Sequence, residues 1–324
     1  MSELARILIY GDLHLSSKNY GAHRDYPNET LDILRKITAK ASEIQATHII
    51  GLGDFAFGRF NTLEYRAAVE SELETQYNIC NGNRFELKGN HDSAGYGMTE
   101  FEYYIQKGLI HPSRNLKIGQ VNIGMVDFGK VRKSDFVPDP NMLNVVLAHD
   151  YFTFKDLNMP NFGKNIELDE FKPWFGVDHI ICGHIHSSGV YEGLMVGTVD
   201  GKSIGKRVTL DYVGSMSRPA YYGESTDVVG HMVILTIYDN GDMKYDRIDV
   251  ELLPISEAFN LEIKAEKEAK EDMKNKRLDI ADIVQQLNSH ERITGNPEDI
   301  IMGLDGVDIR FKKKAIELLK LGQA

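Results

Sequence analysis

Seven side chains that could bind metal ions occur in short motifs, most of which directly follow an apolar run. They are carboxylates, imidazoles and one amide: Asp12, His14, Asp54, Asn90, His149, His184 and His186. In the first and last motifs the two donors are two residues apart, so an extended segment points both to one side. Oxygen and imidazole donors without a thiolate suit Mn²⁺, Fe or Zn²⁺ better than copper(I) or an iron–sulfur cluster.

The size of this donor set indicates two ions rather than one. Seven donors are too many for a single ion that keeps an open coordination position, whereas they suffice for two ions that share a bridging carboxylate. Two cations roughly 3.5 to 4 Å apart can share a hydroxide, hold a phosphate and neutralise the oxygens of an in-line displacement. The chemistry expected of the set is therefore phosphoester hydrolysis.

The order of these motifs along the chain predicts an α/β fold. Short apolar runs at 6–10, 48–52 and 84–88 have strand character, and each ends in one of the first three motifs. Apolar residues at helical spacing separate them, at 28–44, where Asn28 is the expected cap, and at 63–77. This βαβαβ order predicts a largely parallel sheet with helices on its faces, whose polar edge binds the ligand.

The middle of the chain predicts a second, strand-rich layer. After a short helix expected at 99–107, the apolar segments 116–118, 121–127 and 144–147 are interpreted as hairpin-linked strands because Gly119-Gln120 is a turn signal. The run 178–182 leads into the histidine pair, and 189–250 is rich in Val, Tyr, Ile, Thr and Gly.

Beyond Pro254 the composition changes. Residues 255–292 are highly charged with few apolar positions, which fits either a partner-binding helix or a flexible linker. Residues 308–321 have the spacing of an amphipathic helix. We therefore expect one domain over 1–250 that carries the metal site, and a small C-terminal cap with a helical, partner-binding extension over 251–324.

Composition excludes several classes of protein. The 324 residues contain no apolar run near the ~20 needed to span a bilayer, and the start lacks a signal-peptide pattern, so we expect a cytoplasmic protein without a membrane partner. Two distant cysteines, Cys80 and Cys182, argue against a disulfide framework. A net charge of -11 argues against coating nucleic acid by bulk electrostatics, although a metal centre and local basic clusters could still bind it.

In this order the motifs resemble the signature of calcineurin-like metallophosphoesterases, over residues 11 to 186. They are Asp12-x-His14, Gly53-Asp54, Gly89-Asn90-His91-Asp92, His149 and Gly183-His184-x-His186. The resemblance implies a two-sheet sandwich with helices outside. It also implies the ligands: Asp12, His14 and His186 for the first metal, Asn90, His149 and His184 for the second, with Asp54 as the bridge.

His91 is not a ligand in that pattern. The resemblance implies that it faces the scissile phosphate, where it stabilises charge or protonates the leaving oxygen as a general acid. Its orienting partner is not evident from the sequence. Asp92 is adjacent, and it either orients His91 or caps the following turn.

A second resemblance concerns the branch of the family. The stretch Tyr212-Val213-Gly214-Ser215-Met216-Ser217-Arg218 is similar to that of SbcD-type DNA-repair nucleases, which usually have proline where Val213 stands. It implies a Mn²⁺-dependent nuclease subunit that cuts DNA ends or hairpins, as an exonuclease or an endonuclease. It also implies a homodimer whose C-terminal helices dock on an SbcC-type ATPase.

Two other functions remain open at this point. One is a stand-alone metallophosphoesterase that acts on small nucleotides or phosphomonoesters. The other is a scaffold that keeps the fold only to bind proteins, although such scaffolds normally lose ligands. The lack of a second Asp soon after Asp54 argues against a Ser/Thr phosphatase.

Overall fold

The computed structural model of the chain contains a compact unit, Met1–Asn260, and a second unit, Leu261–Ala324. It describes residues 1–260 except 21, 58–60, 94–96, 156, 158, 160–164, 200–201 and 219–229, and in the second unit only 262, 301, 302, 312, 313 and 316. Most of the helix expected at 308–321 and most of 255–292 therefore lie outside the described residues. The division after residue 250 stays a prediction.

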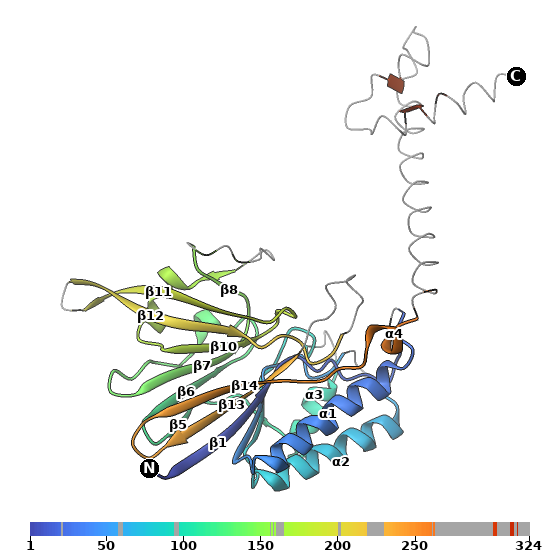
Figure 1. The fold of residues 1–324 in the computed structure, drawn as a ribbon, viewed down its shortest axis with the longest axis horizontal. Helices are drawn as coiled ribbons and strands as arrows, with labels where there is room; N and C mark the ends of the chain where they lie inside the picture. The colour runs from blue at the N-terminus through green and yellow to red at the C-terminus, as the bar shows by residue number, and fades with distance from the viewer. Residues whose placement is uncertain are drawn as a thin grey trace, which may run out of the picture. The chain divides into compact units, whose positions relative to one another are not determined.

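Two mixed six-stranded sheets form the compact unit (Figure 1). The first sheet contains, in order, β14 (Met243–Asp249), β13 (His231–Tyr238), β1 (Glu3–Tyr10), β2 (His48–Gly51), β3 (Arg84–Glu86) and β4 (His111–Pro112). Strands β1 to β4 are parallel, whereas β13 is antiparallel to both of its neighbours. The carboxyl ends of β1, β2 and β3 therefore lie at one edge.

The second sheet contains, in order, β11 (Gly189–Val199), β12 (Lys202–Tyr212), β10 (His179–Gly183), β7 (Leu143–His149), β6 (Val121–Val126) and β5 (Leu116–Ile118). Strands β12, β10, β7 and β6 are parallel. The predicted hairpin joins β5 to β6, but the prediction is wrong for β7, which is parallel to β6. The segment between β6 and β7, which includes η1 (Val131–Lys133), carries the chain back to the start of β6. Strand β7 therefore begins beside the first residue of β6 and runs in the same direction.

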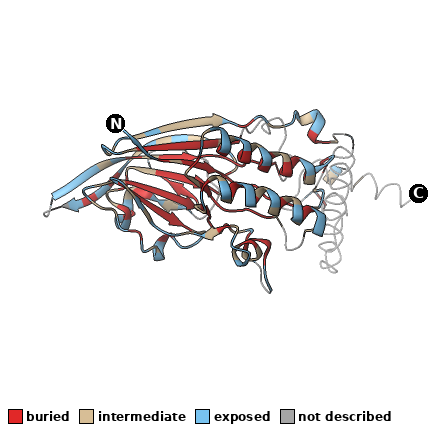
Figure 2. Ribbon diagram, turned by 90° about the horizontal axis from the view of Figure 1, so that it is seen from below, coloured by how far each residue is buried: buried red, intermediate tan, exposed pale blue. Residues whose placement is uncertain are grey.

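Apolar side chains between these layers hold the fold together. One buried cluster lies between the sheets, with Ile7 and Ile9 from β1 facing Leu147 of β7 and Ile181 of β10. Another joins the outer face of the first sheet to α1 (Tyr26–Glu43), α2 (Leu63–Ile79) and α3 (Glu100–Gln106). Figure 2 shows buried residues in the strands and along one side of these helices. The predicted α/β sandwich is confirmed.

The outer face of the second sheet has a different cover. Its buried cluster centres on Trp174 and includes residues of β8 (Phe152–Thr153) and η2 (Leu168–Glu170). The cover also contains β9 (Ile166–Glu167) and η3 (Lys172–Trp174).

A short helix, α4 (Ile255–Ala258), follows β14. Among the described residues, none of the helices is both long and apolar enough to cross a bilayer.

Helix α1 begins earlier than predicted. Asp25, not Asn28, is its N-cap, since the Asp25 carboxylate accepts the backbone N–H of Asn28 at 3.3 Å. Pro27 in the first turn needs no hydrogen-bond acceptor, which favours this start. The earlier start adds Tyr26 to the helix, and the Tyr26 hydroxyl donates to the backbone carbonyl of His14 at 3.0 Å.

A fully buried polar cluster lies beneath the polar edge of the first sheet. Arg84 of β3 donates to the Glu86 carboxylate at 2.8 Å and to the Tyr10 hydroxyl, which itself donates to Glu86 at 2.7 Å. The same carboxylate hydrogen-bonds to the backbone of Gly53. Arg84 and Glu86 therefore connect the strands to the loop that carries Asp54.

Replacement of Arg84 by Leu should lower the free energy of unfolding by about 3–5 kcal/mol, because it leaves Glu86 charged, buried and without its cation. Arg207→Leu is the matched control, since Arg207 pairs with Glu192 in solvent and its loss should change stability by less than about 1 kcal/mol. Urea unfolding at pH 7 measures both. Equal effects of the two substitutions would contradict this account of the cluster.

Candidate metal centre

All eight side chains predicted from the sequence lie where strands of the two sheets end. Asp12 and His14 follow β1, Asp54 follows β2, and Asn90 and His91 follow β3. The second sheet contributes His149, the last residue of β7, and the pair that follows β10. Parallel strands within each sheet bring these ends to one edge, so residues 172 positions apart become neighbours.

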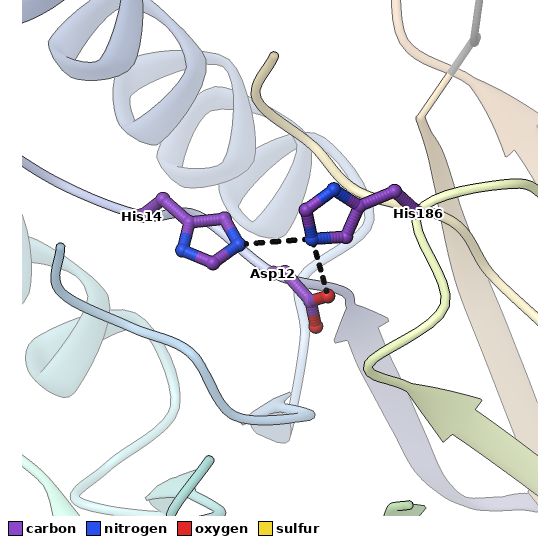
Figure 3. Close-up of side chains that lie close together, drawn as sticks. All are labelled: Asp12, His14 and His186. Carbon is purple, nitrogen blue, oxygen red and sulfur yellow. Dashed lines mark hydrogen bonds and ion pairs between the residues drawn. The ribbon is translucent and has the colours of Figure 1, made fainter. Parts of the chain in front are cut away.

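The first group of donors consists of Asp12, His14 and His186 (Figure 3). The Nε2 atoms of His14 and His186 are 3.1 Å apart, and Nε2 of His186 is 3.6 Å from Oδ2 of Asp12. One ligand atom from each residue lies within 4.8 Å of the others. The backbone N–H of His184 donates to both oxygens of Asp12 at 3.1 Å, which fixes the carboxylate.

The second group consists of Asn90, His149 and His184. Oδ1 of Asn90 lies 3.1 Å from Nε2 of His149 and 3.0 Å from Nδ1 of His184. Asp54 lies between the two groups, since its Oδ2 is 3.4 Å from Nε2 of His149 and 3.9 Å from Nε2 of His14. Seven donors thus form one continuous cluster with a carboxylate at its centre.

The backbone at this edge adopts conformations that L-residues rarely occupy. His14, Asp54 and His184 have φ angles of 49°, 50° and 77°. Such strain persists only where the surrounding structure enforces it, and it concentrates at functional sites. Gly89 permits the close approach of two loops, because a Cβ at that position would lie 2.1 Å from Oδ1 of Asp54.

The charge balance of the cluster favours a cation. Burial raises the pKa of Asp12 to about 7, against the lowering effect of His149. Burial alone would also raise the pKa of Asp54 and lower that of His149, but their mutual attraction is stronger. It holds the pKa of Asp54 below its ordinary value, and together with Asp12 it raises that of His149 to about 9. Two buried carboxylates therefore attract whatever positive charge is available.

The remaining ligand candidates offer neutral imidazoles. Burial lowers the pKa of His14 and of His186, and it lowers that of His184 to about 4. These side chains are therefore unprotonated at neutral pH, the form in which histidine binds a metal.

The tautomer of His149 provides a direct test of whether the residues fit a metal. Its Nδ1 donates to the backbone carbonyl of Leu52 at 2.7 Å, which leaves a lone pair on Nε2 of the neutral ring. That lone pair faces the oxygens of Asn90 and Asp54, all of them acceptors. Acceptors this close need positive charge between them. In the free site the raised pKa of His149 supplies it as a proton on Nε2, and a divalent metal ion bound by nitrogen and oxygen can replace that proton, so the cluster fits such ions.

His91 differs from the seven donors because its side chain is exposed. Its ring centroid is 5.0 Å from that of His14, and its backbone N–H donates to Oδ1 of Asp54 at 2.8 Å. One of its ring nitrogens also lies within 4.8 Å of the ligand atoms of His14 and Asp54. His91 thus borders the donor cluster on its open side.

The structure gives Asp92 a role that sequence reasoning missed. Its carboxylate is buried and accepts the backbone N–H groups of Gly89 at 2.9 Å, Phe55 at 3.2 Å and Ala56 at 3.1 Å. It therefore connects the loop after β2 to the loop after β3, and none of its described hydrogen bonds involves the His91 ring. The polar motif alone gave no signal for this, because the partners are backbone groups of a distant loop.

Comparison with known proteins gives one matching family and several similar solved structures. The family of calcineurin-like phosphoesterases matches residues 5–188, more than half of the chain and all eight predicted site residues. A dimetal phosphatase from Danio rerio is similar at 10% identity and a TM-score of 0.40, over 78% of this chain and 100% of that one. Vps29 from Chaetomium thermophilum is similar at 13% identity and a TM-score of 0.35, over 77% and 100%. No curated protein matches the chain.

Replacement of Asp92 by Asn should weaken metal binding roughly 10- to 100-fold, the usual effect of losing a residue that orients ligands. The amide has one acceptor oxygen in place of two, so at least one of the three backbone N–H groups loses its partner. Calorimetric titration with Mn²⁺ measures the change. Asp169→Asn is the control, because among the described hydrogen bonds Asp169 accepts only the backbone N–H of Lys155, which lies outside the donor cluster. Equal Mn²⁺ affinities in the two variants would contradict the role of Asp92.

Proposed function

Because the chain belongs to the calcineurin-like phosphoesterase family, we propose that it is a stand-alone, two-metal phosphoesterase that hydrolyses small nucleotides or other small phosphate esters. The observation that carries this proposal is the complete donor cluster, with Asp54 in contact with both of its halves. A scaffold that had lost catalysis would have no need to keep two carboxylates buried beside four imidazoles.

We assign the ligands by proximity and by the family resemblance. Asp12, His14 and His186 would hold one cation. Asn90, His149 and His184 would hold the other. Asp54 would touch both, which its position between the groups supports. Mn²⁺ is our first choice of metal, with Fe and Zn²⁺ as the alternatives that the same donors accept.

When bound, the cation pair supplies Lewis acidity to the phosphate and makes a hydroxide nucleophile available at neutral pH. The protein supplies position and proton transfer. His91, exposed at the border of the cluster, would donate a proton to the leaving oxygen. Its backbone N–H is held by Asp54, so the loop that carries the acid is fixed to the proposed bridging ligand.

The charge of the chain supports a small substrate. A net charge of -11 disfavours the many phosphate contacts that hold a protein on DNA, whereas a single phosphate needs only the local charge of the metal centre. The wider surface therefore gives no general attraction to a polyanion.

The resemblance of one segment to SbcD-type nucleases, together with its place behind the first motif, supports a second candidate, the nuclease. The segment that resembles SbcD-type nucleases lies directly behind the first motif, where the backbone N–H of Met216 donates to the carbonyl of Asp12 at 2.9 Å. The Ser215 hydroxyl donates to the same carbonyl at 3.1 Å. In this candidate the substrate would be DNA, and the protein would act as a homodimer with an SbcC-type ATPase bound to residues 251–324.

One substrate panel separates the two candidates. Purified protein with Mn²⁺ is given bis(p-nitrophenyl) phosphate, p-nitrophenyl phosphate, cyclic nucleotides and end-labelled duplex, hairpin and single-stranded DNA. Our proposal expects rapid hydrolysis of the small esters and intact DNA. Cleavage of DNA with little turnover of small esters would favour the nuclease, and inactivity towards every substrate would overturn both.

Replacement of His91 by Asn should lower kcat by about 100- to 10,000-fold, the range typical of a lost general acid, while the Mn²⁺ content stays unchanged. Elemental analysis and steady-state kinetics measure the two effects. His111→Asn is the matched control, because His111 lies in β4 at the far side of the sheet and contacts the rings of Tyr77 and Phe85. Loss of metal together with activity would show that His91 is a ligand and not the acid.

A further inference from the structure

Two phenylalanine side chains border the metal centre at opposite ends of its row of histidines. Phe128 lies beside His184, with ring centroids 5.3 Å apart, and beside His149 at 6.0 Å. Phe57 lies beside His91 at 5.1 Å and beside His14 at 5.5 Å. Each ring therefore contacts histidines of a different half of the site.

Packing of the core does not explain either ring. Neither Phe57 nor Phe128 belongs to the clusters of apolar residues found in the described part of the compact unit. Phe128 is 40% exposed and is the only phenylalanine among the exposed large apolar residues of the described part of the chain. A single exposed apolar residue needs no explanation, but two aromatic rings at both ends of one polar site form a pattern.

The backbone of Phe128 is held firmly in place. Its N–H donates to the carbonyl of Lys88 at 2.9 Å, in the loop that leads to Asn90. The next residue, Gly129, donates to the Asp150 carboxylate at 3.3 Å, immediately after His149. Phe128 thus keeps a fixed position relative to the second group of donors.

Phe57 is fixed in a similar way at the other end. Its backbone N–H donates to the carbonyl of Leu15 at 3.0 Å, one residue beyond His14. Its ring packs edge-on against Tyr20 at 4.5 Å, and the ring plane is tilted 43° from that of His91. An aromatic surface therefore lies next to the proposed general acid.

From this arrangement we infer that Phe57 and Phe128 are stacking platforms for nucleobases, one on each side of the phosphate bound at the metal centre. This inference rests on the proposed function and narrows its substrate to nucleotide phosphodiesters. A phosphodiester extends from its phosphorus in two directions, and every base offers a flat aromatic face that stacks on phenyl rings whatever its sequence. A phosphomonoester or an aliphatic ester would gain nothing from the second ring.

The test compares two substrates with the same bond to be broken. One is the dinucleotide of two thymidines, and the other is its abasic analogue, in which both bases are replaced by hydrogen. Wild-type protein with Mn²⁺ should hydrolyse the thymidine dinucleotide with a kcat/KM roughly tenfold or more above that of the analogue, mainly through KM. In Phe128→Leu and in Phe57→Leu the ratio should fall towards one, and Phe128→Tyr should restore it.

Controls separate this inference from the proposed function. Phe175→Leu is the matched substitution. The Phe175 ring packs against Gly197 of β11, away from the donor cluster, so this substitution should leave the ratio unchanged. Mn²⁺ content is measured for each variant, since rings that only shield histidines would alter metal binding and not the ratio. A ratio near one in the wild-type protein would overturn the inference of stacking platforms, even if bis(p-nitrophenyl) phosphate is hydrolysed. So would a wild-type ratio that both Leu variants retain. No hydrolysis of bis(p-nitrophenyl) phosphate or either dinucleotide would overturn the proposed function itself.

Discussion

Two buried carboxylates, Asp12 and Asp54, impose the constraint on which the rest of this structure depends. Both are almost completely inaccessible to solvent, and negative charge removed from water is unfavourable unless positive charge or hydrogen-bond donors compensate it. Burial lowers the pKa of His14, His184 and His186, so of the four donor histidines only His149 offers positive charge at neutral pH, and one charge does not balance two carboxylates. The cluster is therefore suited to bind cations, and cations bound there would attract a phosphate.

The fold meets this constraint through several supports behind the donor cluster. Asp92 fastens two of the loops to each other, and the buried pair of Arg84 and Glu86 ties the strands to the turn before Asp54. On the other side, the hydroxyl of Tyr26 in α1 holds the carbonyl of His14. Left-handed backbone conformations at His14, Asp54 and His184 are the local consequence, because the supports fix the loops more strongly than φ preferences oppose them.

Much of the fold and of the candidate site could be predicted from the sequence, for identifiable reasons. The donors follow apolar runs whose period is that of strands, and parallel strands necessarily deliver their ends to one edge. The prediction of Asn28 as the N-cap of α1 is wrong, because Asp25 and Asn28 are equally good caps by residue type and the place of Pro27 in the first turn favours Asp25. The direction of β7 depends on where a loop returns the chain, which local pattern does not encode.

The supports behind the site were equally hidden from sequence reasoning. Asp92 acts on backbone N–H groups, which every residue except proline carries, so its partners have no sequence signature. The position of Phe128 beside His184 depends on two long-range contacts. One is the pairing of strands within the second sheet, and the other is the hydrogen bond from Phe128 to Lys88 in the loop after β3. Local spacing thus predicted the donor candidates that the structure brings together, whereas contacts between distant segments determine what supports them and what borders them.

Crystals grown with Mn²⁺ and measured at a wavelength where manganese scatters anomalously would test the central claim most directly. The account predicts two anomalous peaks about 3.5–4 Å apart, one among Asp12, His14 and His186 and the other among Asn90, His149 and His184, with Asp54 touching both. A single peak, or manganese bound only outside this cluster, would contradict it.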